Sequence, residues 1–173
     1  DIGNVTGIRR GQTRRAILLE AHMDTVFPRG TVTAAPSVID GEIHCPGVGD
    51  NTVGLVTVIT ALKVLNHLGI QTRHDLIFAG TVREEGLGNP GGIRRLIDTF
   101  RNSLDACITV DGFQYQDIVY KGSGIHTERI CFNGRGGHSA ERDIYPQALL
   151  AAAAAADRIG RLPLQGTQTI AVT

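Results

Sequence analysis

Two adjacent glutamates, Glu84 and Glu85, follow an apolar run at residues 76–80 and are the first candidates for chemistry. Such a run is typical of a buried strand, so the pair is expected at the strand's carboxyl end, where open α/β sheets place their active sites. Two like charges side by side in a half-buried loop repel each other, and a bound metal ion would neutralise them. The alternative for a lone Glu-Glu pair is a solvated loop.

Further candidate ligands follow the neighbouring predicted strands and extend this pair into a possible metal site. His22 follows a strand at residues 16–21, Asp111 follows a strand at 106–110, and Asp50 begins a helix that leaves the same edge. One histidine with several carboxylates is a ligand set for zinc first, and then for cobalt or manganese. Each residue alone is more often structural, but five at successive strand ends favour a metal site.

Asp24 stands two residues after His22, so in an extended chain the two side chains point to the same side. The Asp24 carboxylate is expected to accept the second imidazole N–H and fix the tautomer of the ring. The alternative is an aspartate that only stabilises its loop.

The elements that must position these residues alternate between strands and helices. This order predicts an α/β fold with a mostly parallel sheet, flanking helices and right-handed crossovers. Asn51 is expected to cap the first helix, and Gly69 to end it in a left-handed conformation. The predicted elements are strands at 5–8, 16–21, 75–81 and 106–110, a hairpin at 38–45, and helices at 52–68 and 92–100.

The pattern changes near residues 121–124, which predicts a boundary between a domain at 1–122 and a smaller α+β domain at 123–173. A glycine-rich turn at 134–140 carries His138, and on its own this residue favours a simple turn histidine. Further strands are predicted at 118–120, 125–132 and 169–172, and an alanine-rich helix at 145–159.

Composition argues against several classes of protein. The 173 residues carry a net charge of zero, so nothing indicates binding to nucleic acid or to an anionic membrane. The three cysteines, Cys45, Cys107 and Cys131, are odd in number and widely spaced, which favours a reducing, cytoplasmic compartment over a disulfide framework. No apolar run is expected to span a membrane, and no signal peptide is expected. No G-x-G-x-x-G opens a helix after the first strand, which argues against a dinucleotide-binding domain.

Five motifs occur in a fixed order along the chain: HMDTV at 22–26, GVGDN at 47–51, EEG at 84–86, VDG at 110–112 and GGHSA at 136–140. Together they resemble the di-zinc exopeptidase and deacylase family of carboxypeptidase G, peptidase T, acetylornithine deacetylase, succinyl-diaminopimelate desuccinylase and the aminoacylases. The resemblance spans residues 3–148 and implies a zinc-peptidase-like catalytic domain followed by part of a lid domain that forms homodimers.

The resemblance implies a metal-binding role for four residues. His22 and Glu85 would bind one zinc ion, Asp111 would bind the other, and Asp50 would bridge the two. The peptide bond after Asp50 is often cis in relatives, so the bond to Asn51 is expected to be cis as well.

The resemblance also implies catalytic roles for three residues. Glu84 would be the general base for a metal-activated water, and Asp24 would orient His22. His138 would reach the active site of the partner subunit and stabilise the oxyanion.

The chain departs from the family pattern at its end, because no histidine follows His138 to supply the final zinc ligand. The resemblance therefore implies a segment of a longer enzyme, with weak metal binding and little turnover by itself. Two hypotheses follow: a metal-dependent hydrolase of peptides or N-acyl amino acids, closest to the di- and tripeptidases, and a non-catalytic binding or dimerisation module that retains the fold.

Overall fold

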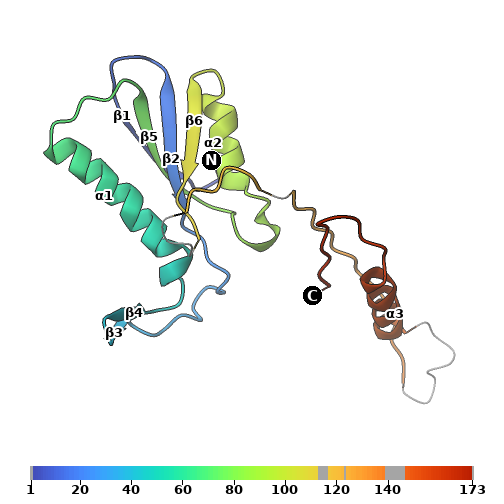
Figure 1. Cartoon of the computed structure of the whole chain (residues 1–173). Coiled ribbons are helices and arrows are strands. Elements are labelled where there is room, and N and C mark those ends of the chain that lie inside the picture. Colours follow the sequence, from blue (N-terminus) through green and yellow to red (C-terminus); the bar gives the residue numbers. More distant parts are fainter. Residues whose placement is uncertain (1, 113–116, 123, 139–146, 173) are drawn as a thin grey trace. The chain divides into compact units, whose positions relative to one another are not determined.

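The computed structural model describes residues 2–112, 117–122, 124–138 and 147–172, and it divides into two compact units, Asp1–Gly122 and Ser123–Thr173. The first unit contains a sheet with helices α1 and α2, and the second contains helix α3 (Figure 1). The elements are β1 Val5–Arg9, β2 Ala16–His22, β3 Ser37–Ile39, β4 Glu42–His44, α1 Val53–His67, β5 Asp75–Thr81, α2 Gly91–Phe100, β6 Leu104–Thr109 and α3 Ala148–Gly160.

The four-stranded sheet has the order β1-β5-β2-β6. Strands β2, β5 and β6 run parallel, and β1 pairs antiparallel with β5 at one edge. The first unit is therefore a mixed α/β structure with a mostly parallel sheet, as the sequence predicted. The parallel pairing brings the carboxyl ends of β2, β5 and β6 to the same edge of the sheet.

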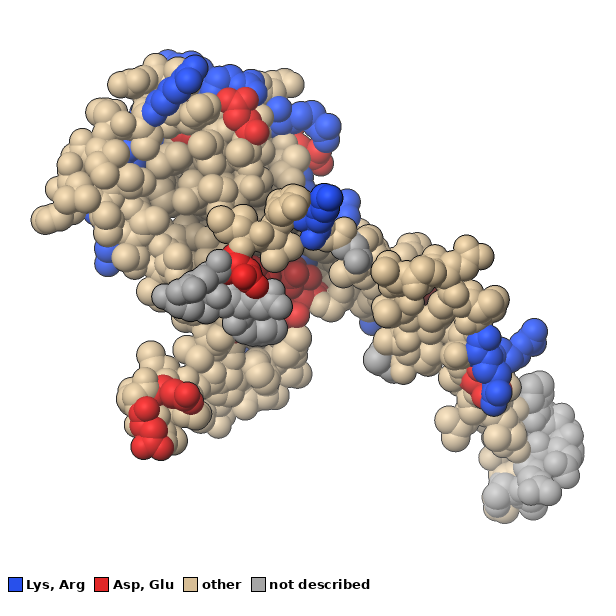
Figure 2. Space-filling view, viewed as in Figure 1, with Lys and Arg blue, Asp and Glu red and all other residues tan. Residues whose placement is uncertain are grey.

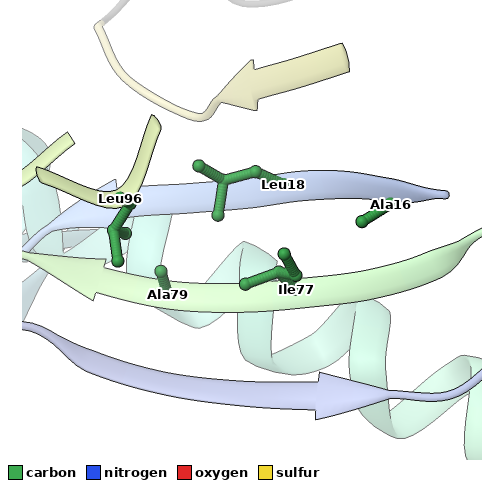
Figure 3. Close-up of a cluster of buried hydrophobic side chains, with 5 residues drawn as sticks. All are labelled: Ala16, Leu18, Ile77, Ala79 and Leu96. Atoms are coloured by element: carbon green, nitrogen blue, oxygen red, sulfur yellow. The ribbon is translucent and has the colours of Figure 1, made fainter. Parts of the chain in front are cut away.

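Both faces of β2 and β5 are covered, which explains why these strands are nearly continuous apolar runs. On one face lies a buried cluster that includes Leu96 from α2 (Figure 3). On the other face lies a second buried cluster, which includes Val58 from α1. The clusters are Ala16, Leu18, Ile77, Ala79 and Leu96 on the α2 side, and Ala21, Val58, Leu76 and Phe78 on the α1 side.

Three predicted strands, at 118–120, 125–132 and 169–172, are not strands in the structure. Ile118 and Ile125 show the reason, since their side chains are 89% and 91% exposed and no neighbouring strand pairs with theirs in the described residues. An alternating sequence specifies a strand only where a partner strand supplies hydrogen bonds. The described part of the second unit contains α3 alone, and the predicted start of that helix at Tyr145 lies outside the described residues.

The segment Val48–His67, which includes α1, is long enough and apolar enough by composition to cross a membrane, with a mean hydropathy of 1.4. This differs from the sequence prediction that no such run exists. The criterion is also met by helices that cover a sheet, and α1 packs Val58, with Leu55 and Leu62, against strands β2 and β5.

Basic side chains of the first unit gather at the end of the sheet where the parallel strands begin (Figure 2). Figure 2 shows Lys and Arg side chains, in blue, gathered at the top of the view, over the end of the sheet where β2 and β5 begin. There Asp75 is buried and accepts hydrogen bonds from the Gly11 amide at 2.8 Å and from Arg10. Asp105 accepts a hydrogen bond from Arg15 and pairs with His74 Nε2 at 2.9 Å. This end of the sheet is therefore held by compensated ion pairs.

The hydrogen bond from Gly11 and the Arg10 guanidinium hold the pKa of Asp75 below its ordinary value of 3.8. A carboxyl group with a lowered pKa stabilises the fold above its ordinary pKa, and this contribution is lost as the pH falls through the folded-state value. Asp75→Asn is therefore expected to lower stability at neutral pH and to reduce the loss of stability on acidification below 3.8. Urea unfolding at pH values on either side of 3.8 measures both effects. Asp98→Asn, at an exposed helix position, is the control, and equal pH dependence of wild type and Asp75→Asn would contradict the prediction.

Candidate metal centre

The candidate ligands converge at the carboxyl edge of the sheet. His22 is the last residue of β2, Glu84 and Glu85 follow β5, and Asp111 follows β6. Asp50 lies in the irregular helical turn Val48–Thr52 that precedes α1. Each strand therefore delivers its polar residue to the same edge, as parallel pairing requires.

These side chains form two groups that share His22. In the first group, His22, Glu84 and Glu85 each offer a ligand atom within 4.8 Å of the others. In the second, His22, Asp50 and Asp111 do the same. His22 and Glu85, the pair implied by the resemblance, are therefore close enough to bind the same ion. His22 and Asp111 are also close enough to do so. The roles of these residues as ligands remain predictions.

The imidazole of His22 is fully buried, and its two nitrogens have different surroundings. Nδ1 lies 2.9 Å from the carbonyl oxygen of Asp24, which can only accept, so Nδ1 carries the proton. In the neutral ring, Nε2 then presents a lone pair towards Asp50 Oδ1 at 2.9 Å and Asp111 Oδ1 at 3.7 Å. The Asp50 contact does not have hydrogen-bond geometry, and the buried Nε2 has no hydrogen-bond partner among the residues that the structure describes.

A metal ion resolves this arrangement. A buried polar atom without a partner is costly, and a lone pair facing carboxylates is repelled by them. Zinc binds nitrogen and oxygen at about 2.0–2.2 Å, so two ligand atoms of one ion lie within roughly 4.4 Å of each other. The separations of 2.9 and 3.7 Å from His22 Nε2 satisfy this limit. The residues present therefore fit a divalent cation.

The raised pKa values of the two glutamates reflect first their burial and then the negative charges around them. Burial and the charges of Asp111, Glu85 and Asp24 raise the pKa of Glu84, although His22 lowers it. Burial and the nearby carboxylates, Asp50 first among them, likewise raise the pKa of Glu85. Without a cation, these carboxylates repel one another, so a bound cation would stabilise their ionised forms.

The pKa of His22 is also raised, although burial, the largest single effect, lowers it. The hydrogen bond to the Asp24 carbonyl and the charges of Asp111, Glu84 and Asp50 together outweigh burial. In the absence of a cation, the acidic site thus favours the imidazolium form of His22.

Asp24 contacts His22 differently from the sequence prediction. The hydrogen bond to the ring comes from the main-chain carbonyl of Asp24, whereas the carboxylate oxygen Oδ1 is 3.7 Å from Nδ1. The reason is that this carboxylate already accepts hydrogen bonds from the backbone amides of Glu84 and Glu85, at 3.3 and 3.1 Å.

Asn51 fixes the turn that carries Asp50. Its side chain is buried and donates a hydrogen bond from Nδ2 to the carbonyl of Val110 at 2.8 Å, while Oδ1 accepts the amide of Gly54 at 3.1 Å. The second bond satisfies a free amide in the first turn of α1, which is the capping role predicted for Asn51. The peptide bond between Asp50 and Asn51 is cis, as expected. Asn51 thus links the start of α1 to the segment that leads to Asp111.

Sequence reasoning missed Glu20, which is buried beside the candidate metal centre. Its Oε2 accepts a hydrogen bond from the Thr81 hydroxyl at 2.7 Å. Both line a cavity of about 180 Å³ that His22, Glu84 and Asp111 also line. The signal was present, since Glu20 is the only charge in a run predicted to be buried on both faces, residues 16–21.

His138 lies in the second unit, in a described part of the chain, and its predicted role stays a prediction. The following motif residues, Ser139 and Ala140, lie outside the described residues. Cys45, Cys107 and Cys131 are free thiols.

Two comparisons with known proteins bear on this site. The model of a family described as peptidase family M20/M25/M40 matches residues 18–169, a range that contains all the candidate site residues. Carboxypeptidase G2 of Pseudomonas sp. (strain RS-16) is 26% identical to this chain over 140 residues, which cover 79% of the chain and 33% of that relative. The chain thus spans about a third of the length of the curated relative it matches.

Proposed function

The chain belongs to peptidase family M20/M25/M40, and from this membership and the geometry of the site we propose that it acts as a zinc-dependent exopeptidase or amidohydrolase. Its substrate would be a peptide or an N-acyl amino acid, cleaved at an amide bond. One observation carries the proposal: His22 Nε2 is buried, forms no hydrogen bond within the described part of the chain and faces carboxylates at the edge of the sheet.

His22, Asp50, Glu85 and Asp111 would hold two zinc ions, with cobalt or manganese as alternatives. When bound, two such ions lower the pKa of a shared water enough for attack on an amide at neutral pH. Asp50 would help to hold a cation because its carboxylate lies beside His22 at the start of α1, where the Asn51 side chain fixes the turn.

Glu84 is the proposed general base. Its carboxylate belongs to one group with His22 and Glu85 but is not needed as a ligand in the proposed set. The Glu84 carboxylate would accept the proton of the attacking water, and the carboxylic acid so formed would donate it to the leaving nitrogen. His138 is the proposed donor to the oxyanion, from the partner subunit of a homodimer formed through residues 123–173. The proposed location is the cytoplasm, in keeping with the three free cysteines.

The experiment that tests this function measures zinc stoichiometry and the hydrolysis of a panel of dipeptides and N-acyl amino acids by the purified protein. The 173-residue chain and the complete gene product are assayed in parallel, because the chain spans about a third of its relative. We expect activity in the complete product that a chelator removes and zinc restores, and little turnover by the 173-residue chain alone. Absence of bound metal and of hydrolysis in both would instead support the non-catalytic binding or dimerisation module.

A further inference from the structure

The carboxylate of Asp24 contacts the backbone of the loop that carries both glutamates. Oδ1 accepts the amide hydrogen of Glu84 at 3.3 Å, and Oδ2 accepts that of Glu85 at 3.1 Å. Each carboxylate oxygen therefore serves one of two consecutive amides. Hydrogen bonds to an ionised acceptor are stronger than those between neutral groups.

The orientation of His22 does not depend on that carboxylate. The acceptor for Nδ1 is the Asp24 carbonyl oxygen at 2.9 Å, and a main-chain carbonyl is retained in any substitution of the side chain. The carboxylate oxygen at 3.7 Å from Nδ1 is beyond hydrogen-bond distance.

The loop needs support because its backbone is strained and its charges repel. Arg83 has φ of 63°, in the left-handed region that non-glycine residues rarely adopt. Such a conformation persists only where surrounding contacts fix it. The Gly91 and Gly92 amides at the start of α2 donate to the carbonyls of Arg83 and Val82, at 3.0 and 2.8 Å. These bonds fix the residues before Glu84, so Asp24 supplies the hydrogen bonds to the amides of the two glutamates themselves.

We propose that Asp24 is a positioning residue for the loop that carries Glu84 and Glu85. Its carboxylate holds the backbone amides of both residues and thereby fixes where the side chains of the proposed base, Glu84, and the proposed ligand, Glu85, lie beside His22. The tasks of the two glutamates rest on the proposed function, whereas the hydrogen bonds that position them do not. Asp24 thus ties β2 to the loop after β5, next to the point where the Met23 amide donates to the Thr81 carbonyl at 2.7 Å.

The test is the isosteric variant Asp24→Asn, studied by NMR on the metal-free protein. An asparagine side chain offers one oxygen and an NH₂ group that cannot accept, so at least one of the two amides loses its partner. We expect hydrogen exchange at the Glu84 or Glu85 amide to accelerate by about tenfold or more, with an upfield amide shift. The hydrogen bond from His22 Nδ1 to the Asp24 carbonyl is expected to persist, and Asp98→Asn is the matched control with no effect at either site.

The opposite pattern, loss of the hydrogen bond from His22 Nδ1 with unchanged Glu84 and Glu85 amides, would overturn the proposal. A second measurement needs no variant: in wild type, scalar coupling across the hydrogen bond between the Glu85 amide nitrogen and the Asp24 carboxylate carbon is expected. Its absence, with the amide exchanging freely, would likewise overturn the proposal. In the active protein, Asp24→Asn is expected to lower kcat with little change in KM. Failure of the proposed function would appear separately, as a wild-type protein that shows the amide signature but hydrolyses nothing.

Discussion

Glu84→Gln is expected to lower kcat for amide hydrolysis by about 10²–10⁴-fold, the usual contribution of a general acid–base group. Glutamine matches glutamate in shape but cannot accept the proton of an attacking water. Its backbone amide keeps the hydrogen bond to Asp24, so the loop is expected to stay in place. Zinc binding should remain near that of wild type, or weaken slightly, because the removed negative charge is not on a proposed ligand but lies near the cation. Steady-state kinetics and isothermal titration with zinc measure the two effects.

Glu85→Gln is the matched control, since it makes the same chemical change at the next residue. Its side chain is proposed to be a ligand, so zinc affinity should fall and activity should partly return at high zinc concentration. Activity of Glu84→Gln should not return, because no added metal replaces a proton acceptor. If both variants lost metal equally, or if Glu84→Gln retained full kcat, the separate roles assigned to the two glutamates would be wrong.

The first unit was predictable because its signals are local. The run at 75–81 became β5 with those bounds, since both of its faces are covered and its apolar pattern is uninterrupted. Gly69 has φ of 61° after α1, as the pattern of a helix end predicts. The order of strands and helices then placed His22, Glu85 and Asp111 at one edge without any knowledge of side-chain contacts.

The remaining features depend on contacts that a linear pattern does not contain. Asp24 was assigned to the imidazole because an extended chain brings the two side chains to one side, yet the amides of a loop sixty residues later compete for the same carboxylate. Glu20 was read only as part of an apolar strand, because its hydrogen-bond partner, Thr81, lies on another strand, β5, and is distant in the sequence. The predicted strand at 125–132 is absent from the structure for the same reason, because alternation of apolar and polar residues does not indicate whether a neighbouring strand is available for pairing.

Gly54→Ala is expected to destabilise the protein by about 2–4 kcal/mol, through overpacking and lost hydrogen bonds of a buried amide side chain. Helix propensity alone predicts the opposite sign, because alanine inside a helix is better than glycine by about 0.5–1 kcal/mol. The packing around Gly54 determines which of these two effects is larger. A Cβ at this position would lie 2.2 Å from Asn51 Oδ1 and 2.5 Å from the carbonyl oxygen of Val110. Asn51 Oδ1 accepts the Gly54 amide and Asn51 Nδ2 donates to the Val110 carbonyl, so this side chain cannot move without losing both bonds.

The displaced Asn51 would carry Asp50 with it, because the two are consecutive in the turn before α1. Gly54→Ala should therefore weaken zinc binding as well as stability, although residue 54 offers no ligand atom. Gly160→Ala at the end of α3 is the matched control, since no described residue lies within 4 Å of a Cβ there, and it should leave both quantities unchanged or raise stability slightly. Urea unfolding and zinc titration of the two variants measure the contrast. A Gly54→Ala protein as stable as wild type, with unchanged zinc affinity, would show that the Asn51 contacts do not hold the turn in place.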